Sequence, residues 1–184
     1  MNTSYWETEK VIICTEKKKY AKEKWEEYKD TRSREMLQLE IELPPISFEE
    51  YEKYFEDCKE LNKQSTSINL YIENKKNEFV GWININWIDK KNGTFSLGMG
   101  IFKDFQNKGY GTDAGRLVLN YCFNELRLNK CNNDCIDYNE ASIQFHKRFG
   151  FTEEGRRRES VYIHGEYRSM ILWGLLKEEF NKKK

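Results

Sequence analysis

Residues 106–112 form a glycine-rich segment whose composition suits the binding of a phosphate group. Gly109 and Gly111 are separated by one residue and stand directly before a stretch with amphipathic helical spacing. The first N–H groups of a helix have no partner within the helix, and the helix dipole adds positive potential there. Lys108 brings a further positive charge. The spacing is neither that of a P-loop, which ends in Lys-Ser/Thr, nor the full dinucleotide fingerprint.

A second group of residues that can do chemistry lies between residues 139 and 149. Asn139, Ser142 and His146 are spaced by three and four, which places them in one polar stripe on a helix. A histidine with an ordinary pKa of about 6.5 can carry a proton near neutral pH. The serine hydroxyl is a second possible donor. The alternative is that His146 lies on a solvated helix face. Phe145 shares the neighbouring, core-facing side of this helix.

The first third of the chain has helical spacing around one proline pair, Pro44 and Pro45. A short strand is expected at 11–14, followed by a helix that Thr15 caps. Ser47 and Glu50 have the spacing of a capping box, which predicts a second helix. The residues expected to be buried on these two helices are Tyr20, Ala21, Trp25, Tyr28, Phe48, Tyr51, Phe55 and Cys58.

From residue 67 the pattern changes to alternation, which is typical of strands. Three strands are expected over 68–73, 83–87 and 94–102, with buried Ile83, Ile85 and Trp87 in the second. The Asn92-Gly93 pair is typical of a tight hairpin and makes this unit antiparallel. Gly98 and Gly100 interrupt the third strand, which indicates a bulge or the close approach of another backbone.

The remaining elements complete an α/β fold with a mixed sheet. A helix follows the glycine segment, a strand covers 131–136, and a helix covers 139–149. Two strands, 151–163 and 166–175, close the chain and are joined by a turn at His164-Gly165. The length of 184 residues predicts one domain, residues 1–184.

Composition excludes several classes of function. The 31 basic and 31 acidic residues cancel, so there is no general attraction to nucleic acid or anionic membranes. The polar first ten residues and the lack of an apolar run of about 20 residues predict a cytoplasmic protein without a membrane span. The five cysteines are scattered, and Cys131 and Cys135 lack a second pair and nearby histidines. No metal site is therefore expected.

Two separated motifs resemble the GNAT acetyltransferase superfamily. Gln106, Gly109 and Gly111 match its acetyl-CoA signature, which is Gln or Arg, two residues, Gly, one residue, then Gly or Ala. Residues 139–151 resemble the helix of that family that runs from an asparagine to a Gly-Phe pair. The closing segments 165–168 and 172–176 resemble the branch of ribosomal-protein amino-terminal acetyltransferases. The similarity covers roughly residues 79–180.

The resemblance implies a GNAT-like fold with a mixed, mostly antiparallel central sheet flanked by helices, and acetyl-CoA as co-substrate. The strand before the glycine segment would splay from its neighbour, so that its backbone near Met99 and Ile101 binds pantetheine. His146 stands where many relatives carry a proton-donating tyrosine, and Ser96 where several carry a glutamate. The resemblance implies the following further coenzyme contacts: Gln106, Asn107, Lys108, Gly109, Tyr110, Gly111, Thr112, Asn139 and Phe145.

The expected function is therefore transfer of an acetyl group to a primary amine, either a protein amino terminus or a small molecule. Acetylation of a polyamine or an antibiotic is an alternative. A polyamine site would need clustered carboxylates, for which the candidates are Glu49, Glu50, Glu52 and Glu56. A non-catalytic domain that senses acyl-CoA is another alternative, favoured by the missing glutamate at Ser96 and the histidine at residue 146. Relatives often pair through their last strands, which implies a homodimer.

Overall fold

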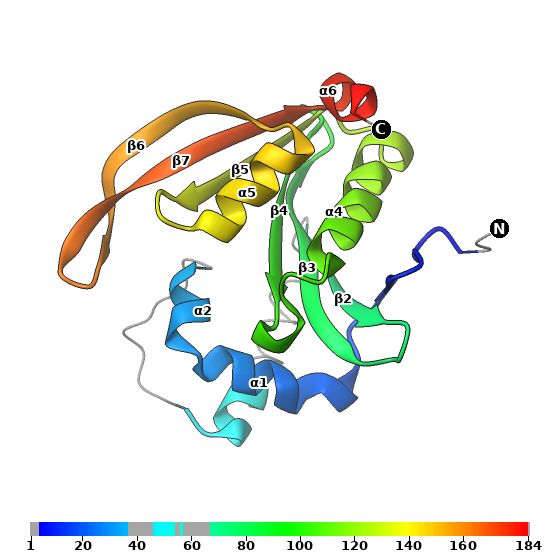
Figure 1. Ribbon diagram of the computed structural model, residues 1–184, viewed down its shortest axis with the longest axis vertical. Helices are drawn as coiled ribbons and strands as arrows, with labels where there is room; N and C mark the ends of the chain where they lie inside the picture. Colours follow the sequence, from blue (N-terminus) through cyan, green and yellow to red (C-terminus); the bar gives the residue numbers. More distant parts are fainter. Residues whose placement is uncertain (1–3, 37–45, 54–55, 57–66, 184) are drawn as a thin grey trace.

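A computed structural model describes residues 4–36, 46–53, 56 and 67–183. Its centre is a seven-stranded sheet with the order β1-β2-β3-β4-β5-β7-β6 (Figure 1). Every neighbouring pair is antiparallel except β4 and β5, which are parallel. The mixed, mostly antiparallel sheet expected from the sequence is confirmed. The strands are β1 Val11–Cys14, β2 Ile68–Asn74, β3 Phe79–Asp89, β4 Thr94–Ile101, β5 Lys130–Ile136, β6 Thr152–Ile163 and β7 Glu166–Leu176.

The helices lie against both faces and the ends of this sheet. In Figure 1, α1 and α2 cross near the ends of the central strands, whereas α4 and α5 run along them. Residues 48–53 are also helical, and a π-helical turn, Tyr121–Glu125, continues α4. The helices with complete bounds are α1 Ala21–Lys29, α2 Thr31–Met36, α4 Tyr110–Asn120, α5 Glu140–Phe149 and α6 Lys177–Lys182.

The first helix begins later than the sequence predicted. A 3-10 turn, Lys18–Tyr20, precedes α1, so Thr15 does not cap it. Trp25 and Tyr28 are half-buried rather than buried. The capping box before the next helix is confirmed, because the Ser47 amide donates to Glu50 and the Glu50 amide donates to the Ser47 hydroxyl. Pro44, Pro45, Phe55 and Cys58 lie outside the described residues.

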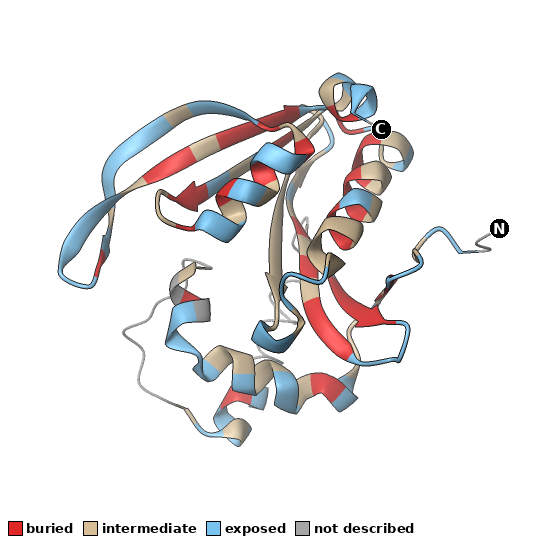
Figure 2. Ribbon diagram, viewed as in Figure 1, coloured by how far each residue is buried: buried red, intermediate tan, exposed pale blue. Residues whose placement is uncertain are grey.

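The main core lies between the sheet and α4, where buried residues of β2 and β3 and Phe95 of β4 share one cluster with buried residues of the helix. Figure 2 shows the buried stretches on β2, β3 and α4. Strand β2 is covered on both faces, although alternation in a sequence is typical of a strand with one buried face. Its second face holds Tyr71 and Glu73. The Glu73 carboxylate is buried with compensation, since it accepts hydrogen bonds from the Lys17 ammonium at 2.5 Å and the Tyr20 hydroxyl at 2.6 Å.

Strand β3 keeps its predicted alternation only up to residue 86. Ile83 and Ile85 are buried, but Trp87 is 78% exposed and has a φ of 53°. The register shifts between Asn86 and Asp89, which turns Trp87 outward. In the following turn only Gly93 has a positive φ. The Asp89 carboxylate accepts the amides of Lys91 and Asn92, and it organises a loop that is longer than a two-residue hairpin.

The two glycines of β4 do not form a bulge. The pairing of β3 with β4 is continuous from Gly81↔Ile101 to Asn86↔Ser96. The glycines instead admit the indole ring of Trp82: a Cβ at Gly100 would lie 2.8 Å from Trp82 Nε1. Close approach by a side-chain ring, which the sequence did not predict, is therefore the reason for glycine at residue 100.

The last third of the chain follows the predicted order. Asn139 caps α5, and Gly150 ends it with a φ of 86°. His164 and Gly165, both with positive φ, form the turn of a long β6–β7 hairpin that extends from the body of the molecule (Figure 1). Strand β6 is mostly exposed. The terminal helix α6 was not expected; the Glu179 carboxylate accepts the amide of Leu176 at its start.

Candidate active site

A fork between the parallel strands β4 and β5 is the feature around which the predicted site residues gather. Backbone pairing joins these strands only at Thr94↔Lys130 and Phe95↔Cys131. Beyond Phe95 the edge of β4 that faces β5 is not paired with it. Leu97 directs its amide toward β5, and backbone groups alternate between the two edges of a strand. Met99 and Ile101 therefore direct their backbone groups into the fork.

The glycine segment leads from the open end of this fork to the start of α4. Gln106 Nε2 donates to the Ile101 carbonyl at 2.9 Å, which ties the segment to β4. Lys108 donates to the Asp104 carbonyl at 2.8 Å. Asn107 has a φ of 60° and Gly109 a φ of 87°, so the chain turns sharply here.

The first turn of α4 keeps its amide donors available. Gly109 precedes the helix, and among the described residues no side chain caps its start. The helix N-terminus therefore points its first N–H groups, at Tyr110, Gly111 and Thr112, outward with the positive end of the dipole. A Cβ at Gly111 would lie 3.2 Å from Met99 Cε, so glycine lets the turn pack onto β4. A Cβ at Gly109 would lie 2.9 Å from Lys10 Nζ. The Lys10 ammonium is therefore a further positive charge at the start of α4, and the sequence did not reveal it.

His146 is not on a solvated face: its side chain is 2% exposed. The ring stacks on Trp173 with centroids 5.2 Å apart and planes 4° apart, and meets the edge of Phe151. Burial lowers the pKa of His146 to about 4, so the ring is neutral at neutral pH. Its Nε2 lies 3.1 Å from Asn133 Nδ2, and its Nδ1 lies 3.4 Å from Ser142 Oγ.

The other predicted residues of α5 have mainly packing and capping contacts. Asn139 accepts the Ser142 amide at 3.1 Å and donates from Nδ2 to the Met36 carbonyl at 3.1 Å, which joins α5 to α2. Phe145 lies against Gly115 of α4, where a Cβ would come within 2.8 Å of the ring. Ser142 is half-buried.

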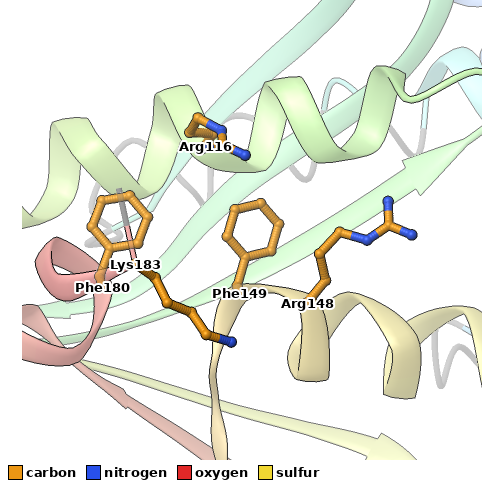
Figure 3. Close-up of a pocket in the computed structure, with 5 residues that line it drawn as sticks. All are labelled: Arg116, Arg148, Phe149, Phe180 and Lys183. Atoms are coloured by element: carbon orange, nitrogen blue, oxygen red, sulfur yellow. The ribbon is translucent and has the colours of Figure 1, made fainter.

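Sequence reasoning missed Arg148. Its Nη1 donates to Thr112 Oγ1 at 2.8 Å, which brings the guanidinium from α5 to the first turn of α4. Arg148 also lines a small cavity of about 40 Å³, together with Phe149 and Phe180 (Figure 3). Arg116 and Lys183 lie at the same cavity, and Lys183 Nζ donates to the Lys147 carbonyl. In the sequence, Arg148 follows Phe145 by three residues, so the two share one side of the helix. This spacing is the one signal that Arg148 lies near α4.

Asn133 was also missed, although the sequence carried a signal for it. Cys131, Asn133 and Cys135 alternate on one face of β5, and both cysteines are buried. A polar residue between two buried neighbours requires a hydrogen-bond partner. Three consecutive arginines occupy residues 156–158 of β6. Arg156 pairs with Glu153 at 2.6 Å and Arg157 lies 3.6 Å from Asp134, so surface ion pairing accounts for these two.

The described residues contain neither a cluster of metal ligands nor a membrane-spanning helix. No group of three or more metal-ligating side chains comes together there. No helix within the described ranges has the length and apolar character needed to cross a membrane.

Comparisons with known proteins assign the chain to a family. Residues 18–152 match the family model "Acetyltransferase (GNAT) domain". Two proteins of Bacillus subtilis (strain 168) are each 35% identical over 104 residues, 56% of this chain. They are the "SPbeta prophage-derived uncharacterized N-acetyltransferase YokL" and the "Putative ribosomal N-acetyltransferase YdaF". The alignments span 59% and 57% of the lengths of these relatives.

A solved structure shows that the whole fold is shared. The spermidine N-acetyltransferase of Vibrio cholerae, in complex with CoA and spermine, superimposes with a TM-score of 0.81 over 95% of this chain and 99% of that chain. At 18% identity this likeness concerns the fold alone. Because the family model matches well over half of the sequence, the chain belongs to the GNAT acetyltransferase family.

Proposed function

We propose that this protein is an N-acetyltransferase that moves the acetyl group of acetyl-CoA to a primary amine. The observation that carries the proposal is the continuity of the β4–β5 fork with the uncapped start of α4. A long, thin coenzyme with a phosphate at one end and a thioester at the other fits this path. Family membership supports acetyl-CoA as the co-substrate. We further propose that residues 1–184 form a single domain.

In this proposal the pyrophosphate rests on the amides from Asn107 to Thr112, with Lys108, Lys10 and Arg148 supplying positive charge. Pantetheine lies along β4, where the backbone groups of Met99 and Ile101 face the fork. Gln106 acts by holding the glycine segment against β4, because its side chain already donates to Ile101. Asn139 and Phe145 act indirectly, by fixing α5 against α2 and α4.

The reaction is direct attack of a neutral amine on the thioester carbonyl carbon. The C–N bond forms as the C–S bond breaks; the amine gives up a proton, and the departing thiolate takes one up. A neutral, buried His146 is poorly suited to supply that proton, since its ring is already deprotonated at neutral pH. We propose Ser142, which retains exposed surface and lies beside His146, as the hydrogen-bond donor to the sulfur.

The acceptor class is an amine of either a protein amino terminus or a small molecule. The name of YdaF supports the first, and the spermine complex of the Vibrio cholerae enzyme supports the second. Glu52 and Glu56 line a cleft with Glu16 and three lysines, but that cleft borders β2 rather than the fork. These carboxylates therefore do not favour a polyamine at the reacting end of the coenzyme.

The second candidate function is an acyl-CoA sensor without catalysis. The buried, neutral His146 favours it, because it removes the most obvious proton carrier from the fork. Release of free thiol from acetyl-CoA, measured with and without a panel of amines and short peptides, separates the two functions. An enzyme gives amine-dependent release. Saturable binding of acetyl-CoA with no release on any acceptor would instead identify the sensor.

Two further parts of the proposal concern the setting of the protein. The free thiols of Cys14, Cys122, Cys131 and Cys135 suit a reducing compartment, which supports a cytoplasmic location.

Tyr162 and Tyr167 are 59% and 66% exposed and pack edge to face on the β6–β7 hairpin. This exposed aromatic pair supports homodimerisation through the last strands, and sedimentation of the intact chain tests it.

A further inference from the structure

The register of β4 and β5 identifies the residue at which the sheet opens. If the pairing at Thr94↔Lys130 continued, Leu97 would stand opposite Asn133. The Leu97 amide does bond there, but it donates to the side-chain Oδ1 of Asn133, at 2.8 Å, instead of to the backbone of β5. The side chain of Asn133 thus occupies the place of a strand-to-strand hydrogen bond.

The Asn133 side chain is held from its other end by His146. Asn133 Nδ2 donates to His146 Nε2 at 3.1 Å, which requires the ring proton to be on Nδ1. Trp173 stands opposite Asn133 in the register of β5 and β7, and the imidazole stacks on that indole. The position and the tautomer of the His146 ring are therefore fixed. The position of the Asn133 carboxamide, which donates to that ring, is fixed with them.

A carboxamide between two strands keeps their backbones farther apart than a direct N–H···O=C bond would. The continuous β3–β4 register shows that the opening does not come from a bulge in β4. It begins where Leu97 contacts Asn133, and Leu97 lies two residues before Met99 along β4. If the pyrophosphate lies at the start of α4, the acyl end of the coenzyme extends along β4 toward this point.

We propose that Asn133 and His146 form a two-residue wedge that holds β4 and β5 apart and fixes the β4 edge that receives the acyl end of acetyl-CoA. This inference rests on the proposed function for its ligand. Both residues are positioning residues. The wedge assigns His146 to the acceptance of a hydrogen bond from Asn133 rather than to proton donation.

Two substitutions at one position separate the wedge from simple packing. His146→Leu fills the site but has no acceptor, so Asn133 loses its second anchor. His146→Gln is less apolar, but its Oε1 can accept from Asn133 Nδ2. We expect His146→Leu to raise hydrogen exchange at the Leu97 amide and to lower kcat, each by about tenfold, the value of one hydrogen bond. The Kd for CoA stays within about threefold, because the phosphate contacts are untouched. In His146→Gln, the exchange rate at the Leu97 amide, kcat and the Kd for CoA all remain near the wild-type values.

A second route covers the case in which His146→Leu does not fold. Asn133→Leu removes both hydrogen bonds and is expected to raise exchange at Leu97 to the same extent. Where His146→Leu does fold, the double variant Asn133→Leu/His146→Leu is expected to lose no more kcat than either single variant, since both substitutions break one unit. Three outcomes would overturn the wedge. They are additive losses of kcat in the double variant, equal losses of kcat in His146→Leu and His146→Gln, and an unchanged exchange rate at the Leu97 amide.

The wedge and the proposed function fail in different ways. If the wild-type chain transfers no acetyl group to any amine, the enzyme proposal fails. Exchange at Leu97 in the three variants still decides whether the wedge exists, because that measurement needs neither coenzyme nor acceptor.

Discussion

Nη1 of Arg148 donates a hydrogen bond of 2.8 Å to Oγ1 of Thr112, and this contact joins the end of α5 to the first turn of α4. The two helices come from sequence segments that each carry part of the family resemblance. Among the described residues Arg148 makes no ion pair with a carboxylate, so its charge is uncompensated beside the proposed phosphate site. Thr112 orients the guanidinium without neutralising it.

Replacement of Arg148 by Gln is therefore expected to weaken binding of acetyl-CoA. Because the site is exposed and screened, we expect a loss of about threefold to tenfold in affinity at low salt, and a smaller loss at high salt. Calorimetric titration measures it. Lys147→Gln, which removes an adjacent exposed charge, is the matched control and leaves the affinity unchanged. Equal losses in both variants would assign the effect to net charge rather than to the Arg148 position.

A charge placed at Gly109 tests the glycine segment. Gly109→Glu and Gly109→Gln are similar in size and equally strained, since both impose a side chain at a φ of 87°. They differ in charge, and a carboxylate repels a pyrophosphate. We expect the Glu variant to bind acetyl-CoA more weakly than the Gln variant by about tenfold or more, as measured by calorimetry. Equal affinities in the two variants would place the phosphate elsewhere.

Burial of His146 gives stability a defined dependence on pH. The ordinary pKa of 6.5 applies to the unfolded chain, and the folded pKa is about 4. Between these values the unfolded state binds more protons, so the free energy of unfolding falls as pH is lowered from 6.5 to 4. The expected loss is about 3 kcal/mol. Urea unfolding of the wild type and of His146→Gln at several pH values measures the contribution of His146. The carboxylates titrate in both proteins, so their contribution cancels in the difference. Parallel pH profiles of the two proteins would contradict it.

The indole of Trp82 makes Gly100 a sensitive position. A Cβ at Gly100 would lie 2.8 to 3.0 Å from three atoms of the Trp82 ring, whereas a Cβ at Gly98 would be no closer than 3.4 Å to any atom. Gly100→Ala is expected to lower the free energy of unfolding by about 1–3 kcal/mol through overpacking. Gly98→Ala, the control on the same strand, changes it by about 0.5 kcal/mol or less. Chemical denaturation checks both, and similar losses would show that Trp82 moves aside.

The sequence was sufficient for the order of most elements because hydrophobic periodicity depends on the chain alone. Ile83 and Ile85 were placed correctly in the core. Trp87 was not, since its orientation depends on a register shift near the end of β3 that alternation does not reveal. Thr15 is a good capping residue by type, but the chain inserts a 3-10 turn before α1.

The site was predicted less completely, because its contacts cross between distant segments. The local pattern identified the glycine segment and the helix at 139–149. Neither Leu97–Asn133 nor Arg148–Thr112 has a local pattern, since 36 residues separate the partners in each pair. The burial of His146 depends on Trp173 from β7, so helical spacing alone left its environment open.

The central claim is that the chain transfers an acetyl group from coenzyme to amine. The most direct measurement is mass spectrometry of candidate acceptors, short peptides with free amino termini and small amines, after incubation with the protein and deuterium-labelled acetyl-CoA. The proposed function predicts that an acceptor gains one labelled acetyl group on a primary nitrogen, at a rate that Gly109→Glu lowers below that of Gly109→Gln. Saturable binding of acetyl-CoA without a labelled acceptor in the panel would contradict it.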